Sequence, residues 1–321
     1  MPPRACIRRL AEWMGEERAT LERVHYRRPA ARGQVEAWRL VPREPRARVV
    51  AAHGAGNDAL YPQMALFKAL VRRGVEVFSF DVDGHGASST TVFAPEIVPS
   101  AVRAAVEMAE RGRPGLPLHL LGHSFGGSLV LHALGTAAVP HAASAIAVSA
   151  PVTVSLGARV AMSELGGFLR AETLEQREHY GLWGTVPAVG PLKRRAYPIR
   201  GAAQPGAPFA YVDAIRELLA RLDLPKTVGE IRAPVLLVYG AADRLVPAEQ
   251  GRALAARMPS SRLIEIPRAT HWSTAFAPDA VAAAAEWIDA HLPSAQCQVP
   301  SAQEPHRWTL GTGHSPPDPE S

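Results

Sequence analysis

Short apolar segments alternate with helical patterns along most of this chain, and this alternation is the feature that most restricts its fold. We expect strands at 21–28, 34–41, 48–52, 75–81, 116–122, 144–151, 233–240 and 262–266. Helical patterns occupy 61–73, 98–111, a segment starting near 126, 249–258 and 278–292. Strands separated by helices form a parallel sheet with helices on both faces. The sequence therefore predicts an α/β fold with a mostly parallel central sheet.

The alternation stops between 152 and 230, where helical stretches and aromatic residues replace the strands. We predict that 152–230 is an inserted, mainly helical cap, which divides the core into 21–151 and 231–292. Residues 1–20 form an N-terminal extension with helical spacing of apolar residues. Residues 293–321 are rich in Pro, Ser and Gln without any period, and we expect this tail to be disordered.

A serine lies between two glycines where an expected strand gives way to an expected helix. The segment Gly122-His123-Ser124-Phe125-Gly126 fits the pattern G-x-S-x-G. A sharp turn between strand and helix needs small neighbours, and the helix N-terminus favours a developing negative charge. An ordinary glycine-rich turn would read the same, so this segment alone does not establish a nucleophile.

Two later loops supply the partners that a serine nucleophile requires. A hydroxyl needs an adjacent base, which is itself oriented by a carboxylate. Asp243 follows the expected strand 233–240, and His271 follows the expected strand 262–266. The carboxyl ends of parallel strands share one sheet edge, where ligands bind. The sequence therefore predicts a catalytic triad of Ser124, Asp243 and His271.

A glycine-rich turn after strand 48–52 completes the pattern. Acyl transfer needs two donors aimed at the developing oxyanion. We expect the backbone amides of Ala55, in His53-Gly54-Ala55-Gly56, and of Phe125 to form this oxyanion hole. We interpret His53, His85 and His123 as structural, with His123 packed under the site and pointing away from Ser124. Asp213 and Asp223 are interpreted as solvated helix positions rather than alternative acids.

These motifs together resemble the α/β-hydrolase superfamily, in its branch of monoacylglycerol lipases, lysophospholipase-like esterases and serine aminopeptidase-like hydrolases. The resemblance covers roughly 30–292 and rests on the segments HGAG (53–56), FDVDGHGAS (80–88), GHSFGG (122–127), GAADRLVP (240–247) and ATHW (269–272). It implies an α/β-hydrolase fold and a serine hydrolase. In that branch an arginine usually stands where this chain has Asp83, which leaves the local salt-bridge pattern and any closer subfamily assignment open.

The leading hypothesis is the hydrolysis of a small or lipid-like carboxylic ester through an acyl-enzyme on Ser124. The same triad would also suit an acyltransferase, a thioesterase, an amidase or a carbon–carbon hydrolase, and the fold could instead serve a non-catalytic ligand-binding protein. We expect Phe168, Trp183 and Tyr197 of the cap, together with Trp272, to bind the substrate.

Composition bears on partners and location. The net charge is +5, but the basic residues are scattered and mostly Arg, with a longest run of three at 193–195, so we expect no nucleic-acid partner. No apolar run approaches the roughly 18 residues of a membrane span, and the N-terminus lacks the apolar region of a secretory signal. We therefore expect a cytoplasmic protein without stable membrane insertion. No spacing for a metal or cofactor is visible, so we expect neither; a homo-oligomer is left open.

Overall fold

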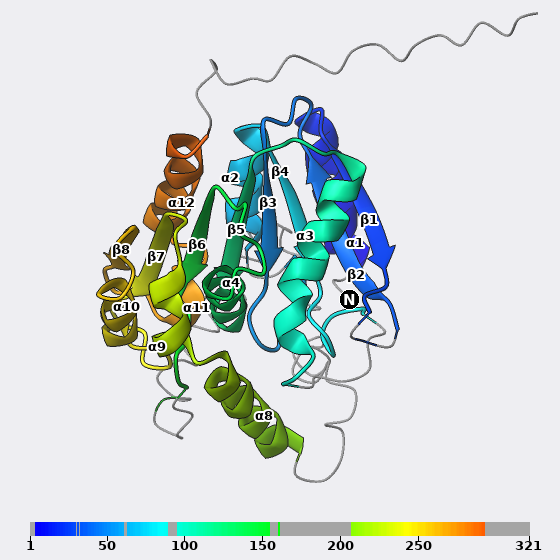
Figure 1. Cartoon of the computed structure of the whole chain (residues 1–321). Coiled ribbons are helices and arrows are strands. Elements are labelled where there is room, and N and C mark those ends of the chain that lie inside the picture. The colour runs from blue at the N-terminus through cyan, green and yellow to red at the C-terminus, as the bar shows by residue number, and fades with distance from the viewer. Residues whose placement is uncertain are drawn as a thin grey trace, which may run out of the picture.

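The computed structural model describes residues 4–29, 31, 33–60, 63–88, 95–154, 160 and 207–292 (Figure 1). The unit built from these residues is a single sheet of eight strands in the order β1-β2-β4-β3-β5-β6-β7-β8. The strands are β1 (Thr20–Tyr26), β2 (Val35–Val41), β3 (Ala47–Ala52), β4 (Val75–Phe80), β5 (Leu118–His123), β6 (Ser144–Val148), β7 (Val235–Gly240) and β8 (Ser261–Ile266).

The sheet is mostly parallel, as predicted. Strands β4, β3, β5, β6, β7 and β8 pair in parallel, whereas β2 is antiparallel to both of its neighbours. The carboxyl ends of β3, β5, β6, β7 and β8 consequently meet at one edge, with the loops that carry the predicted site residues.

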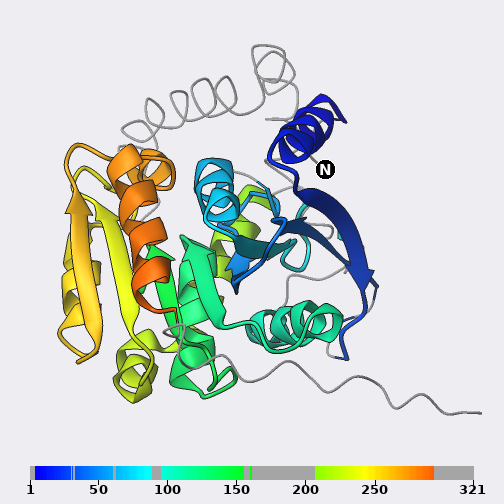
Figure 2. The same cartoon turned by 90° about the horizontal axis from the view of Figure 1, so that it is seen from above.

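Side chains that alternate along the strands feed two separate hydrophobic cores. In β3, Val49 and Ala51 face one core, and Val50 and Ala52 face the other. The first core is covered by α1 (Arg4–Glu16), α2 (Met64–Arg72) and α12 (Pro278–Ala290). The second is covered by α3 (Ala101–Gly112), α4 (Phe125–Gly135), α8 (Ala207–Leu222) and α10 (Ala248–Ala255). Figure 2 shows α1, α2 and α12, in dark blue, blue and orange, on one side of the sheet, with α3 and α4 in teal and green on the other.

Shorter elements lie between these helices and strands. They are η1 (Val98–Ser100), α9 (Leu224–Thr227), η3 (Val228–Glu230) and α11 (His271–Thr274). The described end of the predicted cap is helical, since it consists of α8, α9 and η3. The predicted cap residues 155–159 and 161–206 and the predicted tail 293–321 lie outside the described residues.

Several element ends differ from the sequence expectation because single residues adopt left-handed backbone. The first helix ends at Glu16 rather than near 20, since Arg18 has φ 54° and Thr20 already belongs to β1. Strand β6 ends at Val148 rather than 151, since Ser149 has φ 46°. Tight left-handed positions of this kind have no glycine to mark them in the sequence.

A buried ion pair explains the departure at Asp83. The Arg28 guanidinium, in the loop after β1, donates to both carboxylate oxygens of Asp83, and both side chains are almost fully buried. Arg28 also donates to the Ser100 hydroxyl and the Ile97 carbonyl, at 2.5 and 3.2 Å. Burial lowers the pKa of Arg28 to about 10, so the group stays charged at neutral pH. An arginine of the β1–β2 loop therefore pairs with the 81–88 loop, in which Asp83 stands where the resembled branch usually has an arginine.

Removing one member of this pair should destabilise the protein strongly. Arg28→Leu leaves the buried Asp83 carboxylate uncompensated, which typically costs about 3–5 kcal/mol of unfolding free energy. The measurement is urea unfolding of both proteins. Arg103→Leu is the matched control, since it breaks the exposed Arg103–Glu107 pair and should cost at most about 1 kcal/mol. Equal, small effects of the two substitutions would contradict the assigned role of Arg28.

Candidate active site

Ser124 occupies a sharp, strained turn between β5 and α4. Its backbone has φ 52° and ψ −126°, a conformation that residues with a side chain rarely adopt. The turn is held from both directions: the Ser124 amide donates to the Val148 carbonyl at 2.7 Å, and its carbonyl accepts from the Gly127 amide at 2.8 Å. The Ser124 side chain remains 8% exposed, so the turn presents the hydroxyl at the sheet edge.

The two flanking glycines are required by close backbone packing. A Cβ on Gly122 would collide with the Gly126 backbone, and a Cβ on Gly126 would collide with the backbone of Ala52 and His53. The second contact means that α4 begins directly against the end of β3. The loop after β3 and the turn at Ser124 are therefore positioned by the same contact.

Backbone hydrogen bonds join the loops after β7 and β8 close to Asp243 and His271. The Ala241 amide donates to the Ile266 carbonyl at 3.0 Å, and the Ala242 amide donates to the Ala269 carbonyl at 2.9 Å. His271 then begins α11, where Ser273 Oγ accepts from the Thr270 amide at 2.8 Å. These bonds fix the backbones of Asp243 and His271 relative to each other.

Ser124, Asp243 and His271 form one continuous hydrogen-bond chain. His271 Nδ1 lies 2.8 Å from Asp243 Oδ2, and His271 Nε2 lies 2.9 Å from Ser124 Oγ. The other carboxylate oxygen of Asp243 accepts from the Val246 amide at 2.7 Å. Asp243 and His271 are 5% and 2% exposed. Because both carboxylate oxygens are held, Nδ1 is the ring nitrogen that donates and Nε2 can accept the proton of the serine hydroxyl.

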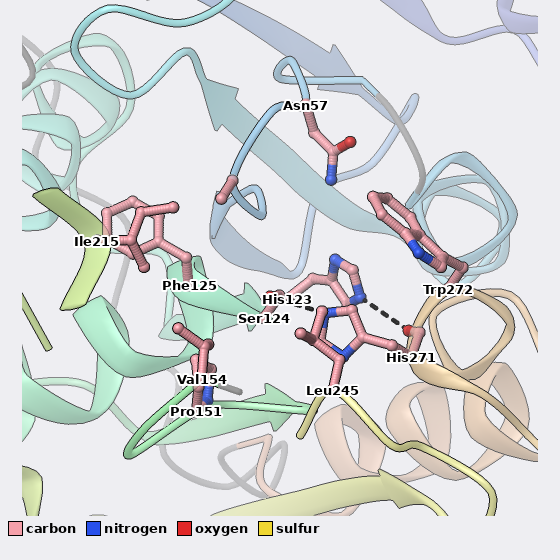
Figure 3. Close-up of a pocket in the computed structure, with 11 residues that line it drawn as sticks. Asn57, His123, Ser124, Phe125, Pro151, Val154, Ile215, Leu245, His271 and Trp272 are labelled. Carbon is pink, nitrogen blue, oxygen red and sulfur yellow. Dashed lines mark hydrogen bonds between the residues drawn. The ribbon is translucent and has the colours of Figure 1, made fainter. Parts of the chain in front are cut away.

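The loop after β3 lies against this chain. The position that a Cβ would take on Gly54 is 3.1 Å from Ser124 Cβ, so the backbone of the loop comes close to the nucleophile. Ala55 and Phe125 both line the cavity that Ser124 also lines, and Figure 3 shows Phe125 and Ser124 in its wall. The Ala55 amide makes no hydrogen bond to another described residue. The arrangement leaves room for the predicted oxyanion hole.

A buried carboxylate secures the same loop from behind. Asp81 Oδ1 accepts from the Ala59 amide at 2.7 Å, and Oδ2 accepts from the Ala87 amide at 2.6 Å. A Cβ on Gly86, where φ is +55°, would collide with this carboxylate. Burial nevertheless raises the pKa of Asp81 to about 8. Asp81 therefore links the loop after β3 to the 81–88 loop.

The cavity in front of Ser124 encloses about 150 Å³ and is mostly apolar. Its apolar lining comes from several loops and from α8, through Ala55, Phe125, Pro151, Val154, Ile215, Leu245 and Trp272. An engineered cavity of this volume in another protein binds benzene. The described part of the site therefore suits a short chain or a small ring.

Of the four residues predicted to bind the substrate, one lies at the cavity and three lie outside the described residues. Trp272 lines the cavity, with its ring edge-on to His271 at a centroid distance of 6.0 Å. Phe168, Trp183 and Tyr197 lie outside the described residues. Asp213 pairs with Arg216 on the exposed side of α8, and Asp223 pairs with Lys226. Neither aspartate lines the cavity. Asp223 precedes α9 in left-handed backbone rather than standing within a helix.

The interpretation of His123 was wrong in one respect. The ring is buried, as expected, but it lines the cavity instead of packing beneath the site. Its Nε2 is 3.5 Å from the His271 carbonyl, and burial lowers its pKa to about 3. The ring points toward the loop after β3, because its Nδ1 lies 3.1 Å from the position of a Cβ on Gly54.

Sequence reasoning also missed part of the cavity wall, notably Asn57, Pro151 and Leu245. All three follow the carboxyl ends of parallel strands, so the rule that identified Asp243 and His271 could have included them. Ile215 carried no comparable signal, because its position depends on how α8 packs over the sheet edge.

Two further observations concern the described residues alone. They contain no group of three or more His, Cys, Asp and Glu side chains placed to hold a metal ion. Among them, no helix has the length and apolar character needed to cross a membrane.

With this fold and geometry in view, comparison with known proteins identifies the class. A model of the alpha/beta hydrolase family matches residues 49–284. The chain belongs to the alpha/beta hydrolase family. The predicted resemblance to hydrolases of this fold is therefore confirmed.

The individual relatives have different activities, and each match is either low in identity or short. The chain is 28% identical to a monoacylglycerol lipase of Mycolicibacterium smegmatis over 68% of this chain and 77% of the relative. It is 40% identical to a 2-hydroxy-6-oxo-6-phenylhexa-2,4-dienoate hydrolase of Burkholderia cepacia, but the match spans only 17% of this chain and 19% of that protein. Among solved structures, a monoglyceride lipase of Saccharomyces cerevisiae superposes with a TM-score of 0.61 at 19% identity, covering 85% of this chain and 96% of that one. That likeness shows the fold.

The buried histidines predict how stability depends on pH. Burial lowers the pKa of His53, His85, His119 and His123, to about 4 for His119 and about 3 for His123. Unfolding returns each pKa to about 6.5. Their contribution to stability is therefore complete above that pH and is lost as the pH falls toward the folded values. Asp81 changes the stability with pH in the opposite direction, because its pKa is raised in the folded state. Its contribution to stability is complete below about pH 4 and is lost as the pH rises to about 8.

Since four histidines oppose one aspartate, the melting temperature should fall clearly between pH 6.5 and 4.5. Thermal unfolding across this range is the measurement. His119→Asn removes one of these histidines, at the end of the sheet away from the site. It should lower the number of protons taken up on unfolding by about one, and so weaken the dependence of the melting temperature on pH. A melting temperature that stays level or rises on acidification would be inconsistent with these neutral histidines.

Proposed function

We propose that this hydrolase cleaves carboxylic esters through an acyl-enzyme on Ser124. The observation that carries the proposal is the unbroken hydrogen-bond chain from Asp243 through His271 to Ser124, which ends at an apolar cavity. A hydroxyl bonded to a neutral imidazole that is oriented by a carboxylate is the arrangement needed for nucleophilic attack. The relative named as a monoacylglycerol lipase supports the choice of an ester bond.

The first half of the reaction forms the acyl-enzyme. Ser124 Oγ attacks the ester carbonyl carbon while its proton passes to His271 Nε2. The carbonyl oxygen gains negative charge, which the backbone amides of Ala55 and Phe125 stabilise. The carbon–oxygen bond to the alcohol then breaks, and the proton on Nε2 passes to the departing oxygen. Asp243 stabilises the imidazolium throughout.

The second half releases the acid. Water gives a proton to His271 Nε2 as it attacks the acyl carbon, and the same two amides stabilise the second oxyanion. The bond to Ser124 Oγ breaks, and the proton returns to that oxygen. The enzyme ends unchanged, with one water consumed.

Loss of the serine hydroxyl should remove nearly all turnover. Ser124→Ala is expected to lower kcat by about 10⁴–10⁶-fold, because the remaining residues act only as a unit with the nucleophile. Hydrolysis of p-nitrophenyl butyrate measures this, with Ser260→Ala as the control at an exposed serine. Substantial turnover by Ser124→Ala would exclude a serine nucleophile.

The apolar cavity predicts a preference for butyrate over acetate. Each buried methylene stabilises the transition state by about 0.8 kcal/mol, so two should raise kcat/KM by about fifteenfold. Val154 lines the cavity, and Val154→Trp should remove this preference while acetate is still cleaved. Thr153→Trp, at an exposed neighbouring position, should leave the preference unchanged. An acetate optimum in the wild type would contradict the assigned acyl pocket.

A further inference from the structure

Asn57 brings a carboxamide into a mostly apolar cavity, where no other described residue bonds it. The residue is 5% exposed and lines the cavity. Its backbone amide donates to the Gly54 carbonyl at 3.2 Å, but its carboxamide makes no hydrogen bond to another described residue. A carboxamide that faces a cavity loses contact with water when a ligand binds, which weakens binding unless the ligand supplies a hydrogen bond. Such a group in a binding cavity is best explained by a ligand that bonds it.

The carboxamide lies beside the catalytic chain. Asn57 Nδ2 is 3.1 Å from the position of a Cβ on Gly54, and that position is equally close to Ser124 Cβ and to His123 Nδ1. In Figure 3 the amide nitrogen of Asn57 points toward His123 and Ser124, and the amide oxygen points away. The group facing the reacting atoms is therefore a hydrogen-bond donor.

The adjacent histidine presents a second polar atom to the same part of the cavity. His123 Nε2 faces the His271 carbonyl, which can only accept, so its proton belongs on Nε2. His123 Nδ1 is then an acceptor, and it is buried without a partner among the described residues. Asn57 Nδ2 and His123 Nδ1 lie equally close to the position of a Cβ on Gly54, and both residues line the cavity beside Ser124.

The chemistry of ester cleavage assigns this side to the leaving group. His271 Nε2 must deliver its proton to the departing alcohol oxygen, so the alcohol lies on the side of His271. Figure 3 shows Asn57 and Trp272 on that side, and Phe125, Val154 and Ile215 on the other. The acyl chain therefore has the apolar half of the cavity, and the alcohol has the half that contains Asn57.

We propose that Asn57 is a specificity residue for the leaving alcohol, and that its Nδ2 donates to an acceptor oxygen, of the ether, carbonyl or hydroxyl kind, a few bonds from the ester oxygen. The proposal rests on the ester hydrolysis proposed above. A site with a buried donor discriminates against an analogue that lacks the matching oxygen, because the donor is then left unpaired. A purely alkyl alcohol of the same shape should accordingly be a poorer leaving group here.

Two esters with the same shape test this directly. 2-Methoxyethyl butyrate and n-butyl butyrate share the acyl group and differ only in an ether oxygen that replaces a methylene. The wild type should favour the methoxyethyl ester in kcat/KM by about five- to tenfold, the value of one hydrogen bond. Asn57→Leu, of similar size without a donor, should abolish that preference by slowing the methoxyethyl ester and sparing the butyl ester. Asn57→Asp at pH 8, which keeps the shape but has no amide donor, should also lose it.

The outcomes separate this proposal from the function on which it depends. A preference that survives in both variants, or an equal loss of both esters in Asn57→Leu, would overturn the role of Asn57 while leaving ester hydrolysis intact. The second result would indicate a residue that merely supports the loop. Failure of the wild type to cleave either ester, or p-nitrophenyl butyrate, would overturn the proposed function itself.

Discussion

The contact between the start of α4 and the end of β3 is the constraint on which the site depends. Gly126 lies so close to Ala52 and His53 that no side chain fits between them. The same contact brings the loop with Ala55 and Asn57 against Ser124, which adopts left-handed backbone. Strain of this kind persists only where the surroundings impose it. Here the surroundings are the parallel pairings of β3, β5 and β6, together with the hydrogen bond from Ser124 to Val148.

The electrostatics of the site follow from burial more than from charge. His53, His85 and His123 lie around the nucleophile turn, and burial keeps all three neutral at physiological pH. The His53 and His85 rings meet edge to face at 5.2 Å, and the His123 and His271 rings lie 5.5 Å apart. A neutral His123 beside His271 adds no repulsion when His271 takes up a proton. The neutral histidines near His271 therefore do not stabilise its protonated form, and in the proposed mechanism Asp243 does so.

Much of this arrangement could be predicted from the sequence, for a definable reason. Strand periodicity and strand ends are local signals, and the rule that parallel strands end at one edge converts them into proximity. The order of Ser124, Asp243 and His271 along the chain was therefore sufficient to predict that they would lie together. The ion pair of Arg28 and Asp83 could not be found in this way, since its members are 55 residues apart and lie on different loops.

The orientation of individual side chains was a second limit. His123 precedes the nucleophile, and its place in the cavity wall depends on the turn angle rather than on its neighbours in sequence. Asn57 follows the oxyanion motif by one residue, yet nothing local distinguishes a buried amide from an exposed one. Both depend on how closely the loop after β3 approaches His123 and Ser124.

The central claim is that Asp243 and His271 make Ser124 an activated nucleophile. A fluorophosphonate probe reports this without any assumption about the substrate, because only an activated hydroxyl reacts rapidly with it. Labelling followed by peptide mass spectrometry should place a single adduct on Ser124. Asp243→Asn, which favours the wrong tautomer of His271, should slow that labelling by several orders of magnitude, about 10⁴-fold in kcat for a comparable triad. Adduct formation at another residue, or labelling of Ser124 at an undiminished rate in Asp243→Asn, would contradict the account.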